Sequence, residues 1–217
     1  MGAADRLPVP PAKPRIENMK LLIFSDIHSD RAALQALMNV EADYYFAAGD
    51  LVNWGRGLEA AGQILERRAG KVYVIPGNHE SEGDIARLCE KHGLNNFHCS
   101  ALSIGPWYVA GLGYSNPTPF DTPGEYTEEQ IAEKLAPFAG RDPMVLICHC
   151  PPKDTNLDRA GGGQHFGSTA VADFISVQQP RYFFCGHIHE AAGVTEQIGR
   201  TWAMNVGKKG YLLELPD

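Results

Sequence analysis

The chain has 217 residues, of which 44% are hydrophobic and 21% are charged, and its formal net charge is −7. This composition is that of a soluble globular protein with enough apolar side chains for a full core. The acidic balance and the lack of any basic run argue against a nucleic-acid-wrapping protein, but phosphate-bearing substrates stay open because bound metal ions can reverse the charge of a site.

The first residues differ in composition from the rest. Residues 1–18 hold four of the fifteen prolines and no apolar run, so we expect a flexible tail and neither a signal peptide nor a membrane span. Met19 directly precedes the first apolar run and is an alternative start. Residues 19–217 contain no repeat or linker and are predicted to form one domain. Five scattered cysteines fit a reducing, cytoplasmic compartment.

From residue 20 onward, short apolar runs alternate with helical patterns. Strands are predicted at residues 20–24, 44–48, 72–75, 144–148 and 182–185. Helical patterns with polar starts or glycine stops span residues 30–42, 58–70, 81–93, 127–138 and 168–179. This alternation indicates parallel strands covered by helices. Residues 96–111 and 194–215 instead resemble successive short strands, which suggests a second, more antiparallel sheet packed on the first.

Each of the five predicted strands runs directly into polar side chains. These are, in chain order, Asp26 and His28, then Asp50, then Asn78, His79 and Glu80, then His149, and finally His187 and His189. In open α/β sheets, ligands bind at the carboxyl ends of the strands. We therefore expect these side chains to gather at one edge of one sheet.

A single histidine at a strand end is more often structural than a ligand. Five such placements on apolar strands are harder to explain that way, because carboxylates and imidazoles are costly to bury without a counter-charge. Divalent metal ions supply one. The set exceeds what one site needs and lacks thiolate, which favours two ions that share a carboxylate, drawn from Mn, Fe, Zn or Ni, with Mn favoured. Cys148 and Cys150 are predicted to be core residues, with a metal role for the pair as the alternative.

These blocks resemble the calcineurin-like metallophosphoesterases, whose motifs are D-x-H, G-D, G-N-H-[DE], an isolated H, and G-H-x-H. The order and strand contexts match from residue 20 to about residue 210, and small single-domain prokaryotic phosphoesterases look most similar. The resemblance implies an α/β fold of two mixed β-sheets packed as a sandwich flanked by helices. It also implies one ion on Asp26, His28, Asp50 and His189 and another on Asp50, Asn78, His149 and His187, bridged by Asp50.

Such a centre would hydrolyse a phosphodiester or phosphomonoester of a small molecule or nucleotide, by attack of a hydroxide held between the ions. His79 follows Asn78 without being needed as a ligand, so it is the candidate general acid. Glu80 is predicted to hydrogen-bond the His79 ring and orient it. The alternative for Glu80 is a surface acid at a helix start.

The sequence departs from the family at one place. Protein phosphatases of this group carry G-D-x-x-D-R-G, whereas this chain has Trp54 where their phosphate-gripping arginine stands. A small phosphodiester or nucleotide is therefore the expected substrate class. Loops 111–126 and 151–167 are predicted to shape the pocket. Arg56 and His165 are candidates for contacting substrate phosphate, with solvated loop charges as the alternative.

Two other classes of function compete with the hydrolase. One is a catalytically silent scaffold that uses the metal fold to bind protein partners, and the other is a nuclease. The complete set of ligands and the general acid favour the enzyme, and the acidic balance disfavours the nuclease. No segment is long and apolar enough to cross a bilayer. The sequence leaves open whether the protein forms a homo-oligomer through an exposed hydrophobic patch.

Overall fold

All five predicted apolar runs form strands in the computed structural model, which describes residues 18–216. Their bounds are β1 (Met19–Phe24), β2 (Tyr44–Ala48), β3 (Val72–Ile75), β7 (Met144–Cys148) and β8 (Tyr182–Cys185). They do not share a sheet as predicted, because β1, β2 and β3 belong to one sheet and β7 and β8 to another. An apolar run shows that both faces of a strand are buried, but it does not show which sheet the strand joins.

The remaining strands extend both sheets at their edges. They are β4 (Asn95–Asn96), β5 (Ser100–Ile104), β6 (Trp107–Leu112), β9 (Thr195–Ile198), β10 (Thr201–Asn205) and β11 (Tyr211–Leu215). The strand orders are β11-β1-β2-β3-β4 and β5-β6-β7-β8-β10-β9, with only β11, β5 and β9 antiparallel to their neighbours. The predicted fold of two mixed sheets flanked by helices is confirmed, although the second sheet has a parallel centre and is less antiparallel than expected.

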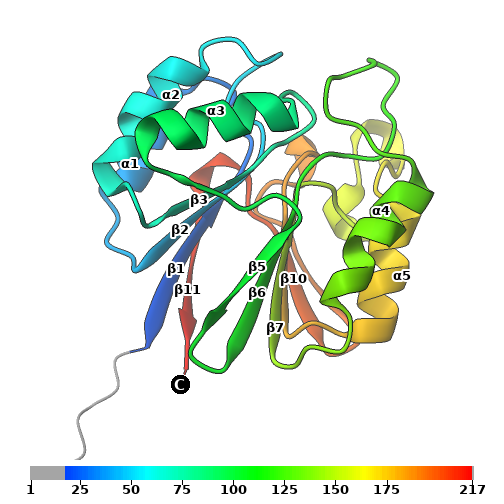
Figure 1. Cartoon of the computed structure of the whole chain (residues 1–217). Helices are drawn as coiled ribbons and strands as arrows, with labels where there is room; N and C mark the ends of the chain where they lie inside the picture. Colours follow the sequence, from blue (N-terminus) through cyan, green and yellow to red (C-terminus); the bar gives the residue numbers. More distant parts are fainter. Residues whose placement is uncertain (1–17, 217) are drawn as a thin grey trace, which may run out of the picture.

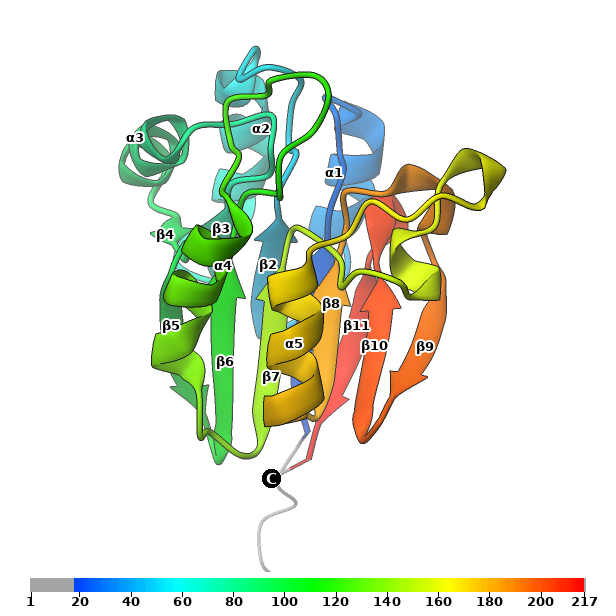
Figure 2. The ribbon, with the colours of Figure 1, turned by 90° about the vertical axis from the view of Figure 1, so that its right-hand side faces the viewer.

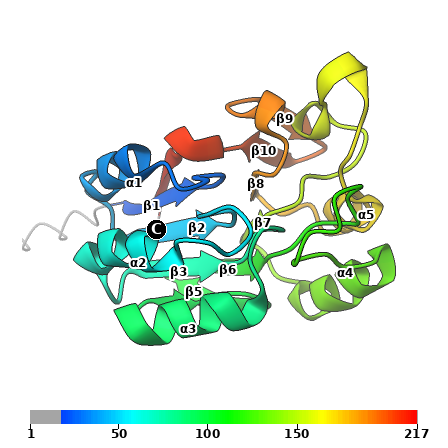
Figure 3. The ribbon, with the colours of Figure 1, turned by 90° about the horizontal axis from the view of Figure 1, so that it is seen from above.

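The helices lie on the two outer faces of the sandwich (Figures 1 and 3). The first sheet is covered by α1 (Arg31–Met38), α2 (Leu58–Leu65) and α3 (Glu82–His92), and the second by α4 (Glu128–Leu135) and α5 (Thr169–Gln178). The predicted caps are present, since the side chains of Asp30, Ser81, Thr127 and Ser168 each accept a backbone N–H of the first turn.

Six 3-10 turns lie between or beside these elements in the described residues. They are η1 (Glu66–Arg68), η2 (Ala136–Phe138), η3 (Asn156–Asp158), η4 (Gly161–Gly163), η5 (His189–Ala191) and η6 (Gly207–Lys209). Residues 18–216 contain no helix with the length and hydropathy needed to cross a bilayer. The tail predicted for residues 1–18 lies outside the described residues, apart from Asn18.

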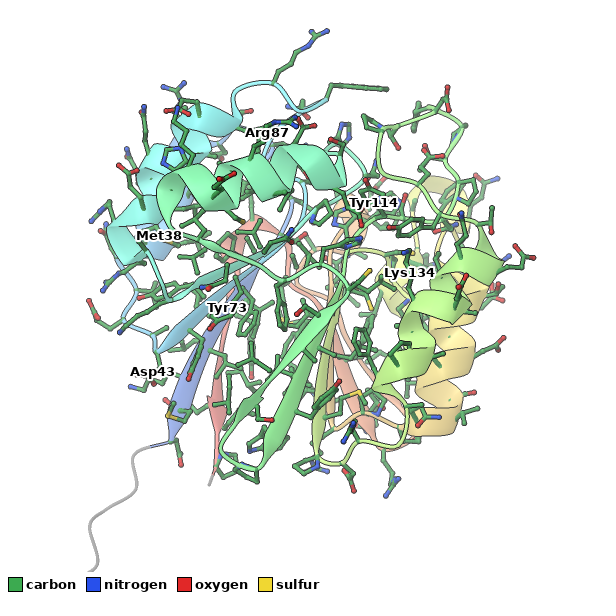
Figure 4. All side chains as sticks on the ribbon, viewed as in Figure 1. Met38, Asp43, Tyr73, Arg87, Tyr114 and Lys134 are labelled. Atoms are coloured by element: carbon green, nitrogen blue, oxygen red, sulfur yellow. The ribbon has the colours of Figure 1, made fainter. Side chains whose placement is uncertain are left out.

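The central core lies between the sheets because alternate strand residues face it. Ile23 and Phe46 from the first sheet meet Ile147 and Phe184 from the second, and all four are buried. Tyr73, labelled in Figure 4, joins this layer, with its ring centroid 5.2 Å from that of Phe46. The other faces of the same strands pack on the helices, so the parallel strands are apolar on both sides.

One polar cluster ties loop 111–126 to the start of α3. The His98 Nδ1 accepts the N–H of Gly113 at 2.9 Å, and its Nε2 lies 3.0 Å from Glu82 Oε1. The Tyr114 hydroxyl accepts the N–H of Glu82 at 2.8 Å, and Figure 4 shows Tyr114 near that end of α3. Burial lowers the pKa of His98 from its usual 6.5 to about 4, although the Glu82 carboxylate opposes this.

His98 makes stability depend on pH. As pH falls below 6.5, His98 becomes protonated in the unfolded chain but stays neutral in the folded protein. The free energy of unfolding therefore decreases until about pH 4, where the folded state also binds the proton. We expect His98 alone to cost about 2 kcal/mol between pH 7 and pH 5. Urea denaturation of His98→Gln, whose amide does not titrate, should show a shallower loss than the wild type by that amount. Equal slopes for the two proteins would contradict this role.

Candidate metal centre

The chain turns sharply at the end of the ligand-bearing strands. Asp26, His28, Asp50 and His187 all adopt left-handed backbone, with φ values of 56°, 45°, 54° and 68°. A positive φ is strained for residues other than glycine, and such a backbone conformation persists where contacts with the surrounding structure stabilise it. Here, hydrogen bonds between turns hold them, since Asp26 N–H donates to Gly49 O at 3.1 Å and His28 N–H to Asp50 O at 2.9 Å.

Two glycines let these turns approach one another. A Cβ atom at Gly77 would lie 2.0 Å from Asp50 Oδ1, and one at Gly186 would lie 2.5 Å from Asp26 Oδ2. No side chain fits at such distances. The glycines of the G-N-H-E and G-H-x-H blocks therefore bring the turn after β3 against Asp50, and the turn after β8 against Asp26.

A first group of donor atoms comes from the turns after β1, β2 and β8. His28 Nε2 lies 2.8 Å from His189 Nε2 and 3.5 Å from Asp50 Oδ2. His189 Nε2 lies 3.8 Å from Asp26 Oδ1. Asp26 and Asp50 are buried, whereas the His189 side chain is 58% exposed. The first group therefore opens toward solvent on the side of His189.

A second group comes from the turns after β2, β3, β7 and β8. Asn78 Oδ1 lies 3.0 Å from His149 Nε2 and 2.9 Å from His187 Nδ1. His149 Nε2 lies 3.4 Å from Asp50 Oδ2, the same oxygen that faces His28 in the first group. The structure thus brings all seven predicted ligands together, from both sheets, with Asp50 common to the two groups.

The second group fits a cation because its lone pairs face one another. His149 Nδ1 lies 2.8 Å from Ala48 O, which only accepts, so Nδ1 carries the proton of the neutral ring and Nε2 keeps its lone pair. That lone pair faces Asn78 Oδ1, because the Asn78 amide nitrogen donates to Thr122 Oγ1 at 3.2 Å. Adjacent acceptors repel unless a proton or a metal ion lies between them.

The first group has the same arrangement. His28 Nδ1 lies 2.7 Å from Asn53 Oδ1, and donating its proton there leaves the Nε2 lone pair facing His189 Nε2 and Asp50. Imidazole nitrogen, carboxylate oxygen and amide oxygen together suit divalent transition-metal ions. Both groups therefore fit divalent cations by the chemistry and direction of their donors.

The pKa values in the centre follow from burial and from Asp50. Burial, with repulsion from His149, lowers the pKa of His187 to about 3, so its ring is neutral at pH 7. Burial would raise the pKa of Asp50, but the His149 imidazole outweighs this and keeps it below the usual range. Burial likewise opposes a charged His149, yet Asp50 raises its pKa to about 9. A proton on His149 and a cation in the centre are thus alternative partners for Asp50.

His79 lies at the mouth of the centre. Its Nδ1 accepts the N–H of Trp54 at 3.3 Å, and its own backbone N–H donates to Asp50 Oδ1 at 3.0 Å. The ring centroid is 5.2 Å from that of His28. Burial lowers the pKa of His79. The ring lines both cavities described below, which places it beside the centre but on its solvent side.

The predictions for Glu80 are wrong. Its carboxylate is fully buried and accepts the N–H groups of Asp50 at 3.1 Å, Gly77 at 2.9 Å and Val52 at 3.0 Å. Both oxygens are occupied there, so Glu80 neither binds the His79 ring nor lies on the surface. Burial, with the nearby Asp50 charge, raises its pKa to about 8. Glu80 positions the backbone of the turns after β2 and β3.

The structure also corrects the predicted substrate contacts. Arg56 is exposed on the loop after β2, and His165 Nδ1 is bound to the buried Asp158 carboxylate at 2.6 Å. Neither residue lines the cavities at the centre. Loop residues are held by their local turns, so a charge near a ligand in the sequence need not point to it.

Two cavities adjoin the donor groups. One, of about 540 Å³, is lined by Asp26, His28, Asn53, His79, His189 and Lys208, among others. The other, of about 390 Å³, is lined by Asp50, Asn78, His79 and His187, together with the side chains of loops 111–126 and 151–167. The prediction that these loops shape the pocket thus holds for the second cavity.

Asn205 was missed by the sequence analysis. It ends β10, is fully buried, and donates from Nδ2 to Gly186 O and Ile188 O, both at 3.0 Å. These carbonyls flank His187, so Asn205 positions the turn that carries His187 and His189. A polar residue at the end of an apolar strand, the pattern used for the other turns, would have found it.

Comparison with known proteins identifies the family. Residues 19–191 match the model of the calcineurin-like phosphoesterases. The chain belongs to this family. It is accordingly a metal-dependent phosphoric ester hydrolase, and divalent metal ions are its cofactors. The family assignment confirms the resemblance read from the motifs.

Three proteins are similar to the chain over most of their length, one in sequence and two in structure. An uncharacterized protein of Methanocaldococcus jannaschii is 29% identical over 204 residues, which cover 91% of this chain and 92% of the relative. The crystal structure of TT1561 of Thermus thermophilus has a TM-score of 0.69 at 19% identity, covering 91% of this chain and 94% of that chain. A dimetal phosphatase of Danio rerio has a TM-score of 0.57 at 11% identity, covering 87% of each chain.

Removing the Asn205 amide should weaken metal binding. In Asn205→Ala the two carbonyls around His187 lose their donor, so the turn loses its fixed position, and we expect Mn²⁺ affinity to fall by roughly 10- to 100-fold. Equilibrium dialysis would measure this. The control is Thr201→Val on the same strand, which removes a buried hydroxyl that lacks a hydrogen-bond partner. A folded Asn205→Ala protein with wild-type Mn²⁺ affinity would contradict the positioning role.

Proposed function

We propose that the protein hydrolyses small phosphodiesters or nucleotide phosphate esters at a centre of two divalent metal ions. Asp26, His28, Asp50 and His189 would hold one ion, and Asp50, Asn78, His149 and His187 the other. The observation that carries the proposal is the position of Asp50 Oδ2, which lies 3.5 Å from His28 Nε2 and 3.4 Å from His149 Nε2. The fold shared with a Danio rerio dimetal phosphatase supports two ions.

Bound divalent ions supply positive charge that polarises the phosphoryl oxygens and makes water a nucleophile at neutral pH. The chain's own residues prepare the centre for that charge. Asp50 stays ionised because of His149, and His187 stays neutral because of burial, so each presents a lone pair at pH 7. Mn, Fe, Zn and Ni all accept mixed imidazole and carboxylate ligands, and Mn²⁺ is the ion that we propose to test first.

His79 is the proposed general acid. Trp54 N–H fixes its Nδ1 as an acceptor, which leaves Nε2 as the nitrogen that carries the transferable proton. The ring lines both cavities, so it can reach a leaving oxygen on either side of the centre. The His79 backbone N–H donates a hydrogen bond to Asp50 Oδ1, so the position of the proposed acid depends on the position of the shared carboxylate.

The scarcity of cations at the centre supports a diester. Lys208 lines the first cavity, but its Nζ is paired with Asp30 Oδ2 at 3.1 Å, and Arg56 lies outside both cavities. A phosphodiester carries one negative charge and a monoester nearly two at pH 7. The proposed ions would supply charge to either ester, but the second charge of a monoester would find no further side-chain cation, which favours the diester.

We expect metal-stripped protein reloaded with Mn²⁺ to cleave bis(p-nitrophenyl) phosphate faster than p-nitrophenyl phosphate. His79→Ala should slow dibenzyl phosphate, whose alkoxide leaving group needs a proton, by roughly 10²-fold or more. It should slow bis(p-nitrophenyl) phosphate much less, because p-nitrophenolate leaves unaided. Initial rates followed by absorbance and chromatography would measure both.

Two variants serve as controls for this assay. Arg56→Ala should retain wild-type rates, because Arg56 is exposed outside the cavities. Asp50→Asn should lose both turnover and metal, because its carboxylate faces both groups. Equal losses for the two diesters in His79→Ala would refute the general acid. An absence of turnover with each of Mn, Fe, Zn and Ni would refute the proposed substrate class.

A further inference from the structure

The second cavity has an aromatic outer wall. Phe120 is 72% exposed and Phe166 is 43% exposed, and both line the cavity that also contains Asp50, Asn78 and His187. Phe120 belongs to loop 111–126 and Phe166 to loop 151–167, two loops at the same end of the molecule (Figure 2). Two exposed phenyl rings in one concave site beside catalytic donors mark a binding surface.

The loop that carries Phe120 is fixed to a metal-ligand residue. The Asn78 amide nitrogen donates to Thr122 Oγ1 at 3.2 Å, and the Gly124 N–H donates to Asn78 O at 2.9 Å. The Phe120 N–H donates to Thr118 Oγ1 at 3.2 Å. The position of Phe120 is therefore set relative to Asn78 by contacts within the protein.

The loop that carries Phe166 is tied to the first loop and to a buried carboxylate. Asn116 Nδ2 donates to Phe166 O at 3.2 Å. The N–H of the next residue, Gly167, donates to Asp158 Oδ2 at 2.9 Å. These two contacts hold the peptide group after Phe166, and the Phe166 N–H donates to Asp158 O at 3.2 Å, so the backbone is held on both sides of this residue. The backbone that carries each phenyl ring is thus held beside the cavity by contacts within the protein.

The charges around this cavity decide what it can accept. Among the described residues, 18–216, no lysine or arginine lines this cavity, and its carboxylates are those of Asp50 and Glu190. A second phosphate or a carboxylate on the substrate would lie there without a counter-charge. An uncharged flat ring would instead stack on the phenyl groups. The first cavity differs, because Lys208 lines it.

We propose that Phe120 and Phe166 form a subsite for an aromatic ring carried on the reacting phosphate, so that the substrates are aryl or nucleoside phosphoesters. This inference rests on the proposed function, since it places the phosphate at Asp50, Asn78 and His187. A ligand that touches both phenyl rings also lies against those residues, because they line one cavity.

The test measures binding to Mn²⁺-loaded protein by titration calorimetry. Benzylphosphonate and methylphosphonate share one head group, and cyclohexylmethylphosphonate matches the benzyl group in size without being aromatic. We expect benzylphosphonate to bind roughly tenfold or more tightly than methylphosphonate, with the cyclohexyl compound between them. Phosphonate analogues of adenosine 5′-monophosphate and ribose 5-phosphate extend the comparison, and a larger ratio for this pair would identify a nucleobase as the ring.

Variants decide whether the two phenylalanines are responsible. Phe120→Ala and Phe166→Ala should each reduce the benzyl-to-methyl ratio toward one while leaving methylphosphonate binding unchanged. The control is Val177→Ala, an exposed apolar side chain on α5 outside the cavity. A ratio near one in the wild type, or a full ratio in both phenylalanine variants, would overturn the subsite. Ring-dependent binding without turnover would refute the proposed function alone, and turnover without ring dependence would refute the subsite alone.

Discussion

The burial of the Asp50 carboxylate is the constraint on which the rest of the centre depends. A carboxylate that is 1% exposed must be paired, and the surrounding turns supply imidazoles on both sides of it. Its backbone adopts left-handed φ, and Glu80 holds its N–H from the neighbouring turn. Gly77 lies so close that only glycine fits there. The residues that surround Asp50 are therefore those that stabilise its buried negative charge or leave room for it.

The two sheets serve this arrangement by meeting at one edge. The first sheet supplies Asp26, His28, Asp50 and Asn78, whereas the second supplies His149, His187 and His189. Neither sheet alone contains both donor groups. The apolar layer between the sheets therefore does more than stabilise the fold, because it sets the distance between candidate ligands more than one hundred residues apart, such as Asn78 and His187. Close packing resists change in that distance.

The centre is flanked by two cavities of different character, and His79 lines both. Lys208 gives one cavity a cation, whereas Phe120 and Phe166 give the other an aromatic wall. Asn78, a proposed metal ligand, also holds the loop that carries Phe120 through hydrogen bonds with Thr122 and Gly124. The Asn78 side chain thus links the proposed metal site to the proposed aromatic subsite.

Local sequence patterns were sufficient to find the main strands, the helices and the candidate donor residues. Apolar runs ending in Asp26, Asp50 or His149 could be recognised locally, because strand periodicity and strand ends are properties of neighbouring residues. The sheet that each strand joins became visible in the folded chain alone. The same holds for two partners, the backbone N–H groups bound by Glu80 and the turn held by Asn205. It also holds for the pocket, which is lined by Phe120 and Phe166 and not by Arg56 and His165. Loop direction and side-chain partners depend on contacts between residues far apart in the chain, and no local pattern encodes those contacts.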